Sequence, residues 1–563
     1  MANQEVPTGP TAQDITVDLL VVGSGTGMAA ALAGKTQGLS TLIIEKSEYV
    51  GGSTAKSGGA FWVPPNPILK REGAGTDKES VQAYIDFLSK EDSSQARRRA
   101  FVEHGHEAVS LLEHMTPLKF FWAKGYSDYH PEKPGGSALG RTCESHPFDV
   151  ARLGEERSRL QPSGIEAPVP MPVTGADYRW LNLMMRVPTK GYSRLFMRLG
   201  QGLGGKVVGR EYAAGGRALA AGLFAGVIEN DIPVWTRTSL VELVVENGRA
   251  SRAIVEQDGR KVTVTIGKGV VLAAGGFDHD MAMRRQMQSP ILQDDIGLGV
   301  TTNTGDAIKA AQACGADIDL MEEAWWFPAF DGLKGQDPLP LLAERSLPGS
   351  LMVNSQGERF INEATDYMTF GQKVLQLARE GKPVGDMWLV FDQKYRNSYM
   401  MAAGIFPGAP IPAAWYEQGS AARGSTPEEL AAGMGVPPSK LRSTLKRFNQ
   451  LARMGEDHDF GRGNSAYDRY YGDPTVSPNP NLRPLGAGLY ATRVVLSDLG
   501  TCGGLVVDEH AQVLDTSGNP IKGMYAIGNN AANVFGRTYP GAGATIGQGL
   551  VFGFIAAKHA AKN

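Results

Sequence analysis

The sequence predicts an α/β protein in which a Rossmann-like domain is discontinuous and encloses an inserted α+β capping domain. Three observations predict this. A strand–helix–strand pattern stands near the start, and strands and a helix return at the end. Between them the composition changes and is rich in Trp, Pro and amphipathic helical stretches. At 563 residues the chain exceeds the usual size of one hydrophobic core. We expect the Rossmann-like domain to cover residues 1–280 and 492–563, and the inserted domain to cover residues 281–491.

The first strand is predicted over Val17–Val22, a mostly apolar run that ends directly in glycines, as a buried parallel strand does. A helix is expected over Met28–Gln37 and a second strand over Thr41–Glu45. Together they form a βαβ unit of about thirty residues. The chain therefore opens with half of a nucleotide-binding fold.

An antiparallel insertion is predicted over residues 233–268, where alternating runs are separated by the hairpin signals Asn247-Gly248 and Asp258-Gly259. Another apolar strand is expected over Gly269–Gly276. In the capping region, Pro427–Gln450 reads as an amphipathic helical stretch, and a last helix is expected over Ile546–Lys562.

Composition narrows the function classes. A formal net charge of -3 without a basic excess argues against nucleic acid as a partner. The three cysteines lie far apart without metal-type spacing, which predicts a reducing compartment and no metal site. Residues 1–15 are polar and lack the pattern of a signal peptide, and no apolar run approaches ~18 residues, so we expect a cytoplasmic protein.

A glycine-rich turn joins the first strand to the first helix. Small residues there let backbone N–H groups approach a pyrophosphate at the helix N-terminus. The residues are Gly23, Ser24, Gly25, Thr26 and Gly27, with Met28 standing where the fingerprint has its third glycine. Glu45 ends the next strand, where a carboxylate can accept hydrogen bonds from ribose hydroxyls, and we assign Lys46 to the same site.

Further glycine- and hydroxyl-rich turns are spread along the chain, as one extended dinucleotide requires. We assign to it Gly51, Gly52, Ser53, Thr54, Ser57, Gly58, Gly59, Ala274, Gly275, Gly528, Asn529 and Gly547. A simple NAD-binding domain has no obvious use for the turns at Gly51–Gly59.

This set resembles the flavoproteins related to succinate dehydrogenase and fumarate reductase, over nearly the whole chain. The resemblance implies a discontinuous FAD-binding domain around an inserted domain that caps the substrate. No Cys or His stands in a recognisable flavin-attachment motif, so we expect noncovalent FAD.

Three tyrosine-bearing segments are similar, within that superfamily, to those of the 3-ketosteroid Δ1-dehydrogenases. The first is Arg537–Gly543, where a phenol O–H and a glycine N–H could both bond one carbonyl oxygen and stabilise an enolate-like charge. The resemblance gives this role to Tyr539 and Gly543. Ala542 departs mildly from the family pattern but leaves both residues in register.

The other two segments are Arg359–Tyr367 and Phe120–Tyr129. The resemblance makes Tyr367 the acceptor of a proton from carbon 2 and gives Tyr129 an assisting role, with Tyr126 as the competing candidate. Aromatic residues elsewhere, Trp325–Pro328 and Phe61-Trp62, could wall a flat apolar pocket or simply pack the core.

The resemblance implies conversion of a 4-ene-3-ketosteroid to the 1,4-diene in steroid or sterol degradation, with hydride passing from carbon 1 to flavin N5. A tyrosine with its reference pKa of ~10 is a poor base, so the chemistry needs either a polarised ketone or a phenol made more acidic by its site. An external acceptor must reoxidise the flavin, because the sequence shows no haem or iron–sulfur motif.

Three alternatives remain open. A fumarate-reductase-type enzyme would need cationic clamps and a His-rich capping domain, whereas His458 is the only histidine between residues 280 and 491. A ketosteroid 4,5-dehydrogenase differs in how the C-terminal tyrosine motif and its base are arranged. A non-catalytic flavin-binding, membrane-docking protein would have no use for the placed tyrosines.

The stretch Arg179–Leu199 combines apolar and basic residues and contains no acidic residue. Such a stretch could rest on an anionic membrane surface, which would make the protein peripheral on the inner membrane. A core helix pair broken at Pro188 and Gly191, or an oligomer contact, would explain the same pattern.

Overall fold

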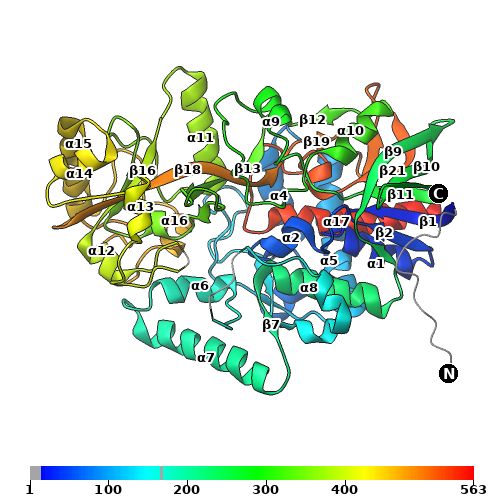
Figure 1. Ribbon diagram of the computed structural model, residues 1–563, viewed down its shortest axis with the longest axis horizontal. Coiled ribbons are helices and arrows are strands. Elements are labelled where there is room, and N and C mark those ends of the chain that lie inside the picture. The colour runs from blue at the N-terminus through cyan, green and yellow to red at the C-terminus, as the bar shows by residue number, and fades with distance from the viewer. Residues whose placement is uncertain (1–13, 165–168, 403) are drawn as a thin grey trace.

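The computed structural model describes residues 14–164, 169–402 and 404–563, and its largest sheet combines strands from both ends and the middle of the chain (Figure 1). The parallel part has the order β21-β11-β1-β2-β8. These strands are β1 (Ile15–Val22), β2 (Thr41–Ile44), β8 (Val234–Trp235), β11 (Arg260–Leu272) and β21 (Pro520–Ala526). The α/β class and the Rossmann-like arrangement are therefore confirmed. The polar segment at residues 1–13 lies outside the described residues.

The predicted hairpins are present as β9 (Thr238–Glu246), β10 (Arg249–Gln257) and the first half of β11. Asn247 and Asp258 have φ of 51° and 49°, as the first residues of tight hairpin turns often do. The expectation of a separate strand at Gly269–Gly276 is wrong. Strand β11 runs on without a break: one edge pairs with β1 from Val264 to Leu272, while the other edge pairs first with β10 and then with β21.

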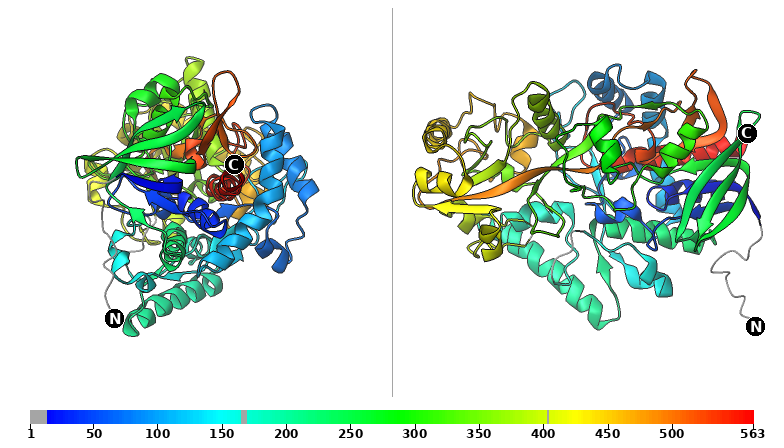
Figure 2. Two further views of the ribbon diagram at one scale, coloured as in Figure 1. Left: turned by 90° about the vertical axis from the view of Figure 1, so that its right-hand side faces the viewer. Right: turned by 45° about the horizontal axis from the view of Figure 1, so that its top comes forward.

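A second sheet, entirely antiparallel, lies at the other end of the molecule (Figure 1). Its strands are β13 (Ala324–Phe330), β14 (Leu339–Pro340), β15 (Ser350–Val353), β16 (Met387–Asp392), β17 (Ala421–Gly424) and β18 (Leu489–Thr501). The long strand β18 runs from this sheet toward the centre of the molecule (Figure 2). It therefore links the second sheet to the part of the chain that returns to the first.

Helices around the second sheet differ in one place from the prediction. The stretch expected as one helix over Pro427–Gln450 forms α14 (Pro427–Met434) and α15 (Pro438–Met454). Gly435 ends α14 in a left-handed conformation, with φ of 70°, and Pro438 at the first turn of α15 starts a new helix. The neighbouring helices are α11 (Tyr367–Arg379), α12 (Gln393–Ser398), α13 (Ala413–Glu417) and α16 (Ala466–Tyr470).

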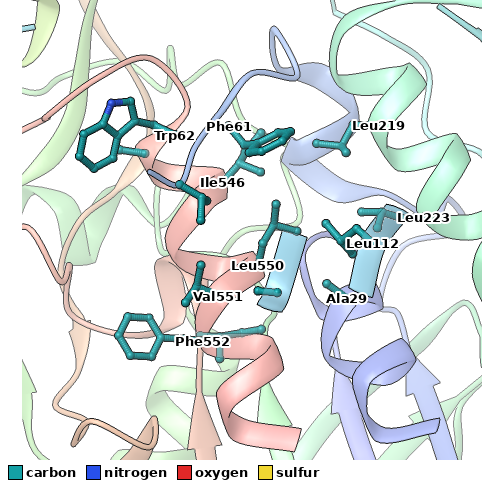
Figure 3. Close-up of a cluster of buried hydrophobic side chains, with 14 of the residues drawn as sticks. Ala29, Phe61, Trp62, Leu112, Leu219, Leu223, Ile546, Leu550, Val551 and Phe552 are labelled. Carbon is teal, nitrogen blue, oxygen red and sulfur yellow. The ribbon is translucent and has the colours of Figure 1, made fainter. Parts of the chain in front are cut away.

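The main hydrophobic core surrounds the C-terminal helix α17 (Ala544–Lys562). Figure 3 shows its side chains meeting those of α1 (Gly27–Thr36), α5 (Gln95–Met115) and α8 (Gly215–Glu229), with Phe61 and Trp62 at its N-terminal end. Nearly every side chain in α1 and the first two-thirds of α17 is buried, which is why both helices are apolar on all sides.

The remaining elements are short and lie mainly around the two sheets. They are α2 (Gly52–Lys56), β3 (Phe61–Trp62), α3 (Pro67–Arg71), α4 (Lys78–Ser89), β4 (Phe120–Trp122), β5 (Thr142–Ser145), β6 (Phe148–Asp149), the 3-10 helix Val150–Arg159, β7 (Tyr212–Ala213), α9 (Met281–Met287), α10 (Asp306–Ala313), β12 (Ile318–Asp319), the 3-10 helix Glu344–Ser346, β19 (Gly504–Leu505), β20 (Gln512–Leu514) and the 3-10 helix Gly528–Asn530.

The basic, apolar stretch forms α6 (Gly175–Asn182) and α7 (Pro188–Val207), with α7 at the outside edge of the molecule (Figures 1 and 2). A break at Pro188 is confirmed, because α7 begins there. The expected break at Gly191 is wrong: Gly191 continues α7 and packs so closely that a Cβ would lie 2.4 Å from Met184 Cα. In the parts of the chain that the structure covers, no helix has both the length and the apolar content to cross a membrane.

A buried ion network fixes the segment that leads into α11. Arg359 bonds Glu363 at 2.7 Å and Asp457 at 2.8 Å, and Arg462 bonds Glu363 at 3.3 Å. These four side chains are almost fully buried, so each charge depends on its partners for compensation.

Replacing Glu363 by Gln leaves two buried guanidinium groups short of a counter-charge. We expect the free energy of unfolding to fall by about 3 kcal/mol. Glu358→Gln is the matched control, because Glu358 pairs with Lys440 at the surface, where such a pair contributes about 1 kcal/mol or less. Denaturant unfolding measures both; equal losses in the two variants would contradict the role of the network.

Candidate active site

Three tyrosines from distant parts of the chain pack against one another. Tyr129 lies in the loop after β4, Tyr367 is the first residue of α11, and Tyr539 lies in the loop before α17. Ring centroids are 5.1 Å apart for Tyr129 and Tyr367, 5.0 Å for Tyr129 and Tyr539, and 5.5 Å for Tyr367 and Tyr539. The hydroxyls of Tyr129 and Tyr367 are hydrogen-bonded to each other. The structure thus brings all three sequence-predicted phenols into one cluster.

Gly543 places a backbone donor at the same point. Its amide lies close enough to the Tyr539 hydroxyl to lower the pKa of that phenol, so the two donors lie side by side. The residue precedes α17 with φ of 91°, and a Cβ on it would lie 2.2 Å from the Ala60 carbonyl oxygen. Only glycine fits this position, which explains why the tyrosine motif ends in glycine.

Tyr126 packs next to Tyr129. Its ring is 6.5 Å from Tyr129, stacks on Tyr470 at 4.5 Å and meets Tyr471 at 5.6 Å. Tyr129 contacts both Tyr367 and Tyr539 through its ring, so the geometry favours Tyr129 over Tyr126 as the assisting residue.

Burial sets the electrostatics of the cluster. It raises the pKa of Tyr129, Tyr367 and Tyr539 above the ordinary value of a tyrosine, and hydrogen bonds from Tyr129 to Tyr367 and from Gly543 to Tyr539 offset only part of this. The surroundings therefore do not make the phenols more acidic. Of the two requirements derived from the sequence, the polarised ketone is the one that this arrangement can meet.

Aromatic side chains of β13 form one wall of the cluster. Trp325 lies 4.6 Å from Tyr539 and Phe327 lies 4.7 Å from Tyr367, ring centroid to ring centroid. Because side chains alternate along a strand, Trp326 points the other way and donates its indole N–H to Glu323. Trp325 thus faces the tyrosine cluster, whereas Trp326 faces the core.

Several polar residues around the cluster were not expected from the sequence. Asp128 accepts from the Trp62 indole at 2.9 Å and from Arg141 at 3.1 Å, and burial raises its pKa to about 6. Tyr467, on α16, has its ring 4.7 Å from Tyr129. Asp128 immediately precedes Tyr129, which was the one available signal; nothing in the sequence pointed to α16.

The turn after β1 suits a dinucleotide phosphate. No side chain caps the N-terminus of α1, and the positive end of the helix dipole there favours an anion. Gly23 has φ of 106°, and a Cβ there would lie 2.3 Å from the carbonyl oxygen of Ala273, so the turn stays close to β11. Gly25 and Gly27 add no side chain to this turn.

Glu45 already has a structural role. Its carboxylate accepts hydrogen bonds from the Ser24 amide and hydroxyl and from the Ser47 amide, and burial raises its pKa. A carboxylate has about four lone-pair sites, so one remains for a ribose hydroxyl. The Lys46 ammonium group donates hydrogen bonds to the side chains of Asp306 and Thr304.

The other expected cofactor residues surround this turn. Ser53 accepts from Val300 and Asn303, and Ser57 donates to the Thr54 carbonyl. The Ala274 amide is bonded to Asn530, whose side-chain nitrogen is buried without a partner. Gly51 and Gly52 begin α2, and Gly58 and Gly59 follow that helix. An unpaired buried amide beside glycine turns fits a missing polar ligand, as FAD would provide.

At the other end of the dinucleotide site, the turns connect to the tyrosine cluster. Asn529, in the 3-10 helix after β21, accepts from the Trp325 indole at 3.0 Å and from Thr545 at 3.3 Å. Gly547, in the first turns of α17, packs against the Trp62 carbonyl, where a Cβ would lie 2.4 Å away. Gly275 has φ of 81° and packs on Asn303.

Glu144 on β5 is a second buried acid near the cluster. It accepts hydrogen bonds from backbone N–H groups at the start of α6, and burial raises its pKa to about 7. Because the folded-state pKa lies above the unfolded value, the stability contribution is greatest below pH 4.5 and is lost as the pH rises through 7.

Glu144→Gln removes this loss. We expect the variant to gain stability over the parent as the pH rises from 5 to 8, by up to about 3 kcal/mol. Melting temperatures across that range measure the difference, with Glu91→Gln on the surface as the control. A constant offset between parent and variant at all pH values would contradict the raised pKa.

Residues 18–546 match the family described as FAD binding domain. The chain is 40% identical to the 3-oxosteroid 1-dehydrogenase of Mycobacterium tuberculosis, over 97% of this chain and 98% of that protein. It is 33% identical to the 4-oxocyclohexanecarboxylate 2-dehydrogenase of Sinomonas cyclohexanicum, over 96% of this chain and 92% of that protein.

Among solved structures, the 3-ketosteroid Δ1-dehydrogenase of Sterolibacterium denitrificans, in complex with 1,4-androstadiene-3,17-dione, is similar to this chain with a TM-score of 0.89. The two chains are 36% identical, and the match covers 97% of this chain and 99% of that one.

Proposed function

This chain belongs to the FAD-binding family that includes the 3-oxosteroid 1-dehydrogenases, and on that premise we propose that it dehydrogenates 3-ketosteroids between carbons 1 and 2. The observation that supports this most directly is the convergence of the Tyr539 hydroxyl and the Gly543 amide beside the hydrogen-bonded pair of Tyr129 and Tyr367. The substrate is a 4-ene-3-ketosteroid, the product is the 1,4-diene, and the reaction belongs to steroid degradation.

The first task of these residues is to polarise the ketone. Tyr539 and Gly543 donate hydrogen bonds to the 3-keto oxygen, which stabilises the negative charge that develops there when carbon 2 loses a proton. This lowers the pKa of the C–H group at carbon 2, so that a weak base can remove its proton. The raised pKa values of the phenols keep them protonated and ready to donate.

The second task is proton removal. Tyr367 takes the proton from carbon 2 while its own hydroxyl proton passes along the hydrogen bond to Tyr129, which in turn releases its proton toward solvent, so that neither buried phenol gains a net charge. Tyr129 thereby assists without contacting the reacting carbon. FAD, when bound, accepts the hydride from carbon 1 and so removes the two electrons.

The glycine turns would hold FAD noncovalently. Gly23–Gly27 would bind the pyrophosphate, Glu45 would bind a ribose, and the α2 turn and residues 274–275, 528–529 and 547 would bind the rest of the dinucleotide. We place the FAD-binding domain at residues 1–280 and 492–563 and the substrate-capping domain at residues 281–491. An external acceptor reoxidises the reduced flavin.

A smaller cyclic ketone is the second candidate substrate, because one relative is named for 4-oxocyclohexanecarboxylate. That substrate carries a carboxylate, whereas the cluster here is walled by Trp325 and Phe327 and lined by neutral phenols. An apolar wall favours a flat steroid ring system over a small anion.

Anaerobic incubation of the holoenzyme with androst-4-ene-3,17-dione and an artificial acceptor should yield the 1,4-diene, and the steroid alone should bleach the flavin. Tyr539→Phe should lower kcat by about 10²–10³ and Tyr367→Phe by about 10²–10⁴, because each removes one donor or acceptor in the transition state. Product analysis by mass spectrometry measures the outcome.

Tyr192→Phe is the control for this experiment, since Tyr192 is exposed on α7. Reduction of the flavin by succinate or by 4-oxocyclohexanecarboxylate, with no response to the steroid, would contradict the assignment.

We propose peripheral membrane association through the outer face of α7. Tyr192, Phe196, Leu203 and Val207 form an exposed apolar stripe at helical spacing, and Phe196 and Val207 are 65% and 87% exposed. The basic side chains contribute less than the sequence indicated, because Arg198 is bonded to Asp177 and Arg186 to Asp473. Apolar insertion, more than charge, would hold the helix at the surface of an anionic membrane.

Sedimentation with anionic vesicles tests this interpretation. Replacing Phe196, Leu203 and Val207 by Ser should lower the bound fraction about tenfold or more, because each side chain no longer buries apolar area. Leu139→Ser, at an exposed position elsewhere, serves as the control. Equal partitioning of parent and triple variant would exclude α7 as the contact.

A further inference from the structure

His130 is in contact with the segments that carry all three clustered tyrosines. It follows Tyr129 in the chain, and its Nε2 lies 3.5 Å from the Thr538 hydroxyl and 4.0 Å from Asp366 Oδ2. Thr538 immediately precedes Tyr539, and Asp366 immediately precedes Tyr367. One imidazole therefore touches the chain neighbour of each of the other two phenols.

The backbone around His130 is fixed to the Tyr539 loop by a buried phenol. Tyr84 donates its hydroxyl to the Pro540 carbonyl at 2.8 Å and accepts the His130 amide at 3.1 Å. The Tyr129 amide donates to the same carbonyl at 3.0 Å. These bonds hold the loops of Tyr129 and Tyr539 together, but none of them reaches α11, where Tyr367 lies.

The side chain of His130 adds a link to the start of α11, beside the bond between the Tyr129 and Tyr367 hydroxyls and the bond from Gln372 on α11 to the Arg537 carbonyl at 3.0 Å. Asp366 is the N-cap of α11: it accepts the Thr369 amide at 2.9 Å and so sets where the helix starts and where Tyr367 points. Its carboxylate is 3% exposed, and its other oxygen faces the His130 ring. The ring itself is partly exposed, with 22% of its side chain accessible.

We propose that His130 is a positioning residue whose imidazole, between Asp366 and Thr538, holds Tyr367 and Tyr539 at the spacing the reaction needs. This inference rests on the proposed function of the three tyrosines. A displacement of about 1 Å among reacting groups can cost on the order of 10²-fold in rate. His130 contacts no reacting atom and acts only through Asp366 and Thr538.

Steady-state kinetics of His130→Ala in the holoenzyme provide the test. We expect kcat with androst-4-ene-3,17-dione to fall about 10- to 100-fold while KM changes about threefold or less, because alignment and not substrate binding is lost. The isotope effect from deuterium at carbon 2 should increase, since proton removal becomes slower, while the effect from carbon 1 should not increase in parallel. His130→Gln, whose side-chain amide can still contact Thr538 and Asp366, should recover much of kcat.

A double-mutant cycle with Thr538→Val isolates the contact. If the imidazole works through Thr538, the double variant should be little slower than His130→Ala alone. Its total loss of kcat should then be much smaller than the product of the two single losses. His106→Ala, at an exposed position on α5, is the control.

Unchanged kcat in His130→Ala, or a loss that tracks a lower melting temperature and flavin content without a larger carbon 2 isotope effect, would overturn the inference. A parent enzyme that does not convert the steroid would instead overturn the proposed function, so the two failures are distinguishable.

Discussion

The hydrogen bond between the hydroxyls of Tyr129 and Tyr367 is the contact on which the rest of the site depends, because it joins residues 238 positions apart in the chain. Phenols buried among aromatic side chains lose their solvation, and a hydroxyl without a partner would cost about 1–3 kcal/mol. Each hydroxyl in the cluster is therefore useful only if another segment supplies its partner at the right distance. The fold must therefore position two loops and the start of α11 with an accuracy of about one ångström.

One helix connects the cluster to the expected cofactor site. Helix α17 begins just after Gly543, beside the Tyr539 hydroxyl, and then packs along α1 in the core. Where it passes the turn after β1, Gly549 lies so close that a Cβ would be 2.4 Å from Thr26 Oγ1. The proposed ketone-binding donors and the proposed phosphate-binding turn are thus attached to the same helix, which would fix the distance between substrate and flavin.

Local sequence patterns predicted what depends on near neighbours. The glycines at 23–27, the strand end at Glu45 and the Asn-Gly and Asp-Gly hairpins all follow from the residue types that those turns require. Gly435 shows the limit of such patterns: its left-handed conformation splits a stretch that reads as one amphipathic helix. The resemblance to ketosteroid dehydrogenases supplied Tyr367 and Tyr539, which spacing alone would not have singled out.

What the sequence could not reveal depends on contacts between distant segments. The pairing of Arg198 with Asp177 and of Arg186 with Asp473 became visible only in three dimensions, and it changes how the basic stretch at α6 and α7 is interpreted. His130 and Tyr467 belong to the same group, because their partners lie more than 200 positions away or on a helix with no signal of its own. The most direct test of the account is a crystal structure of the oxidised holoenzyme with 1,4-androstadiene-3,17-dione. The account predicts the 3-keto oxygen at roughly 3 Å from both the Tyr539 hydroxyl and the Gly543 amide, with Tyr367 next to carbon 2; a ketone oxygen bound to other groups would contradict it.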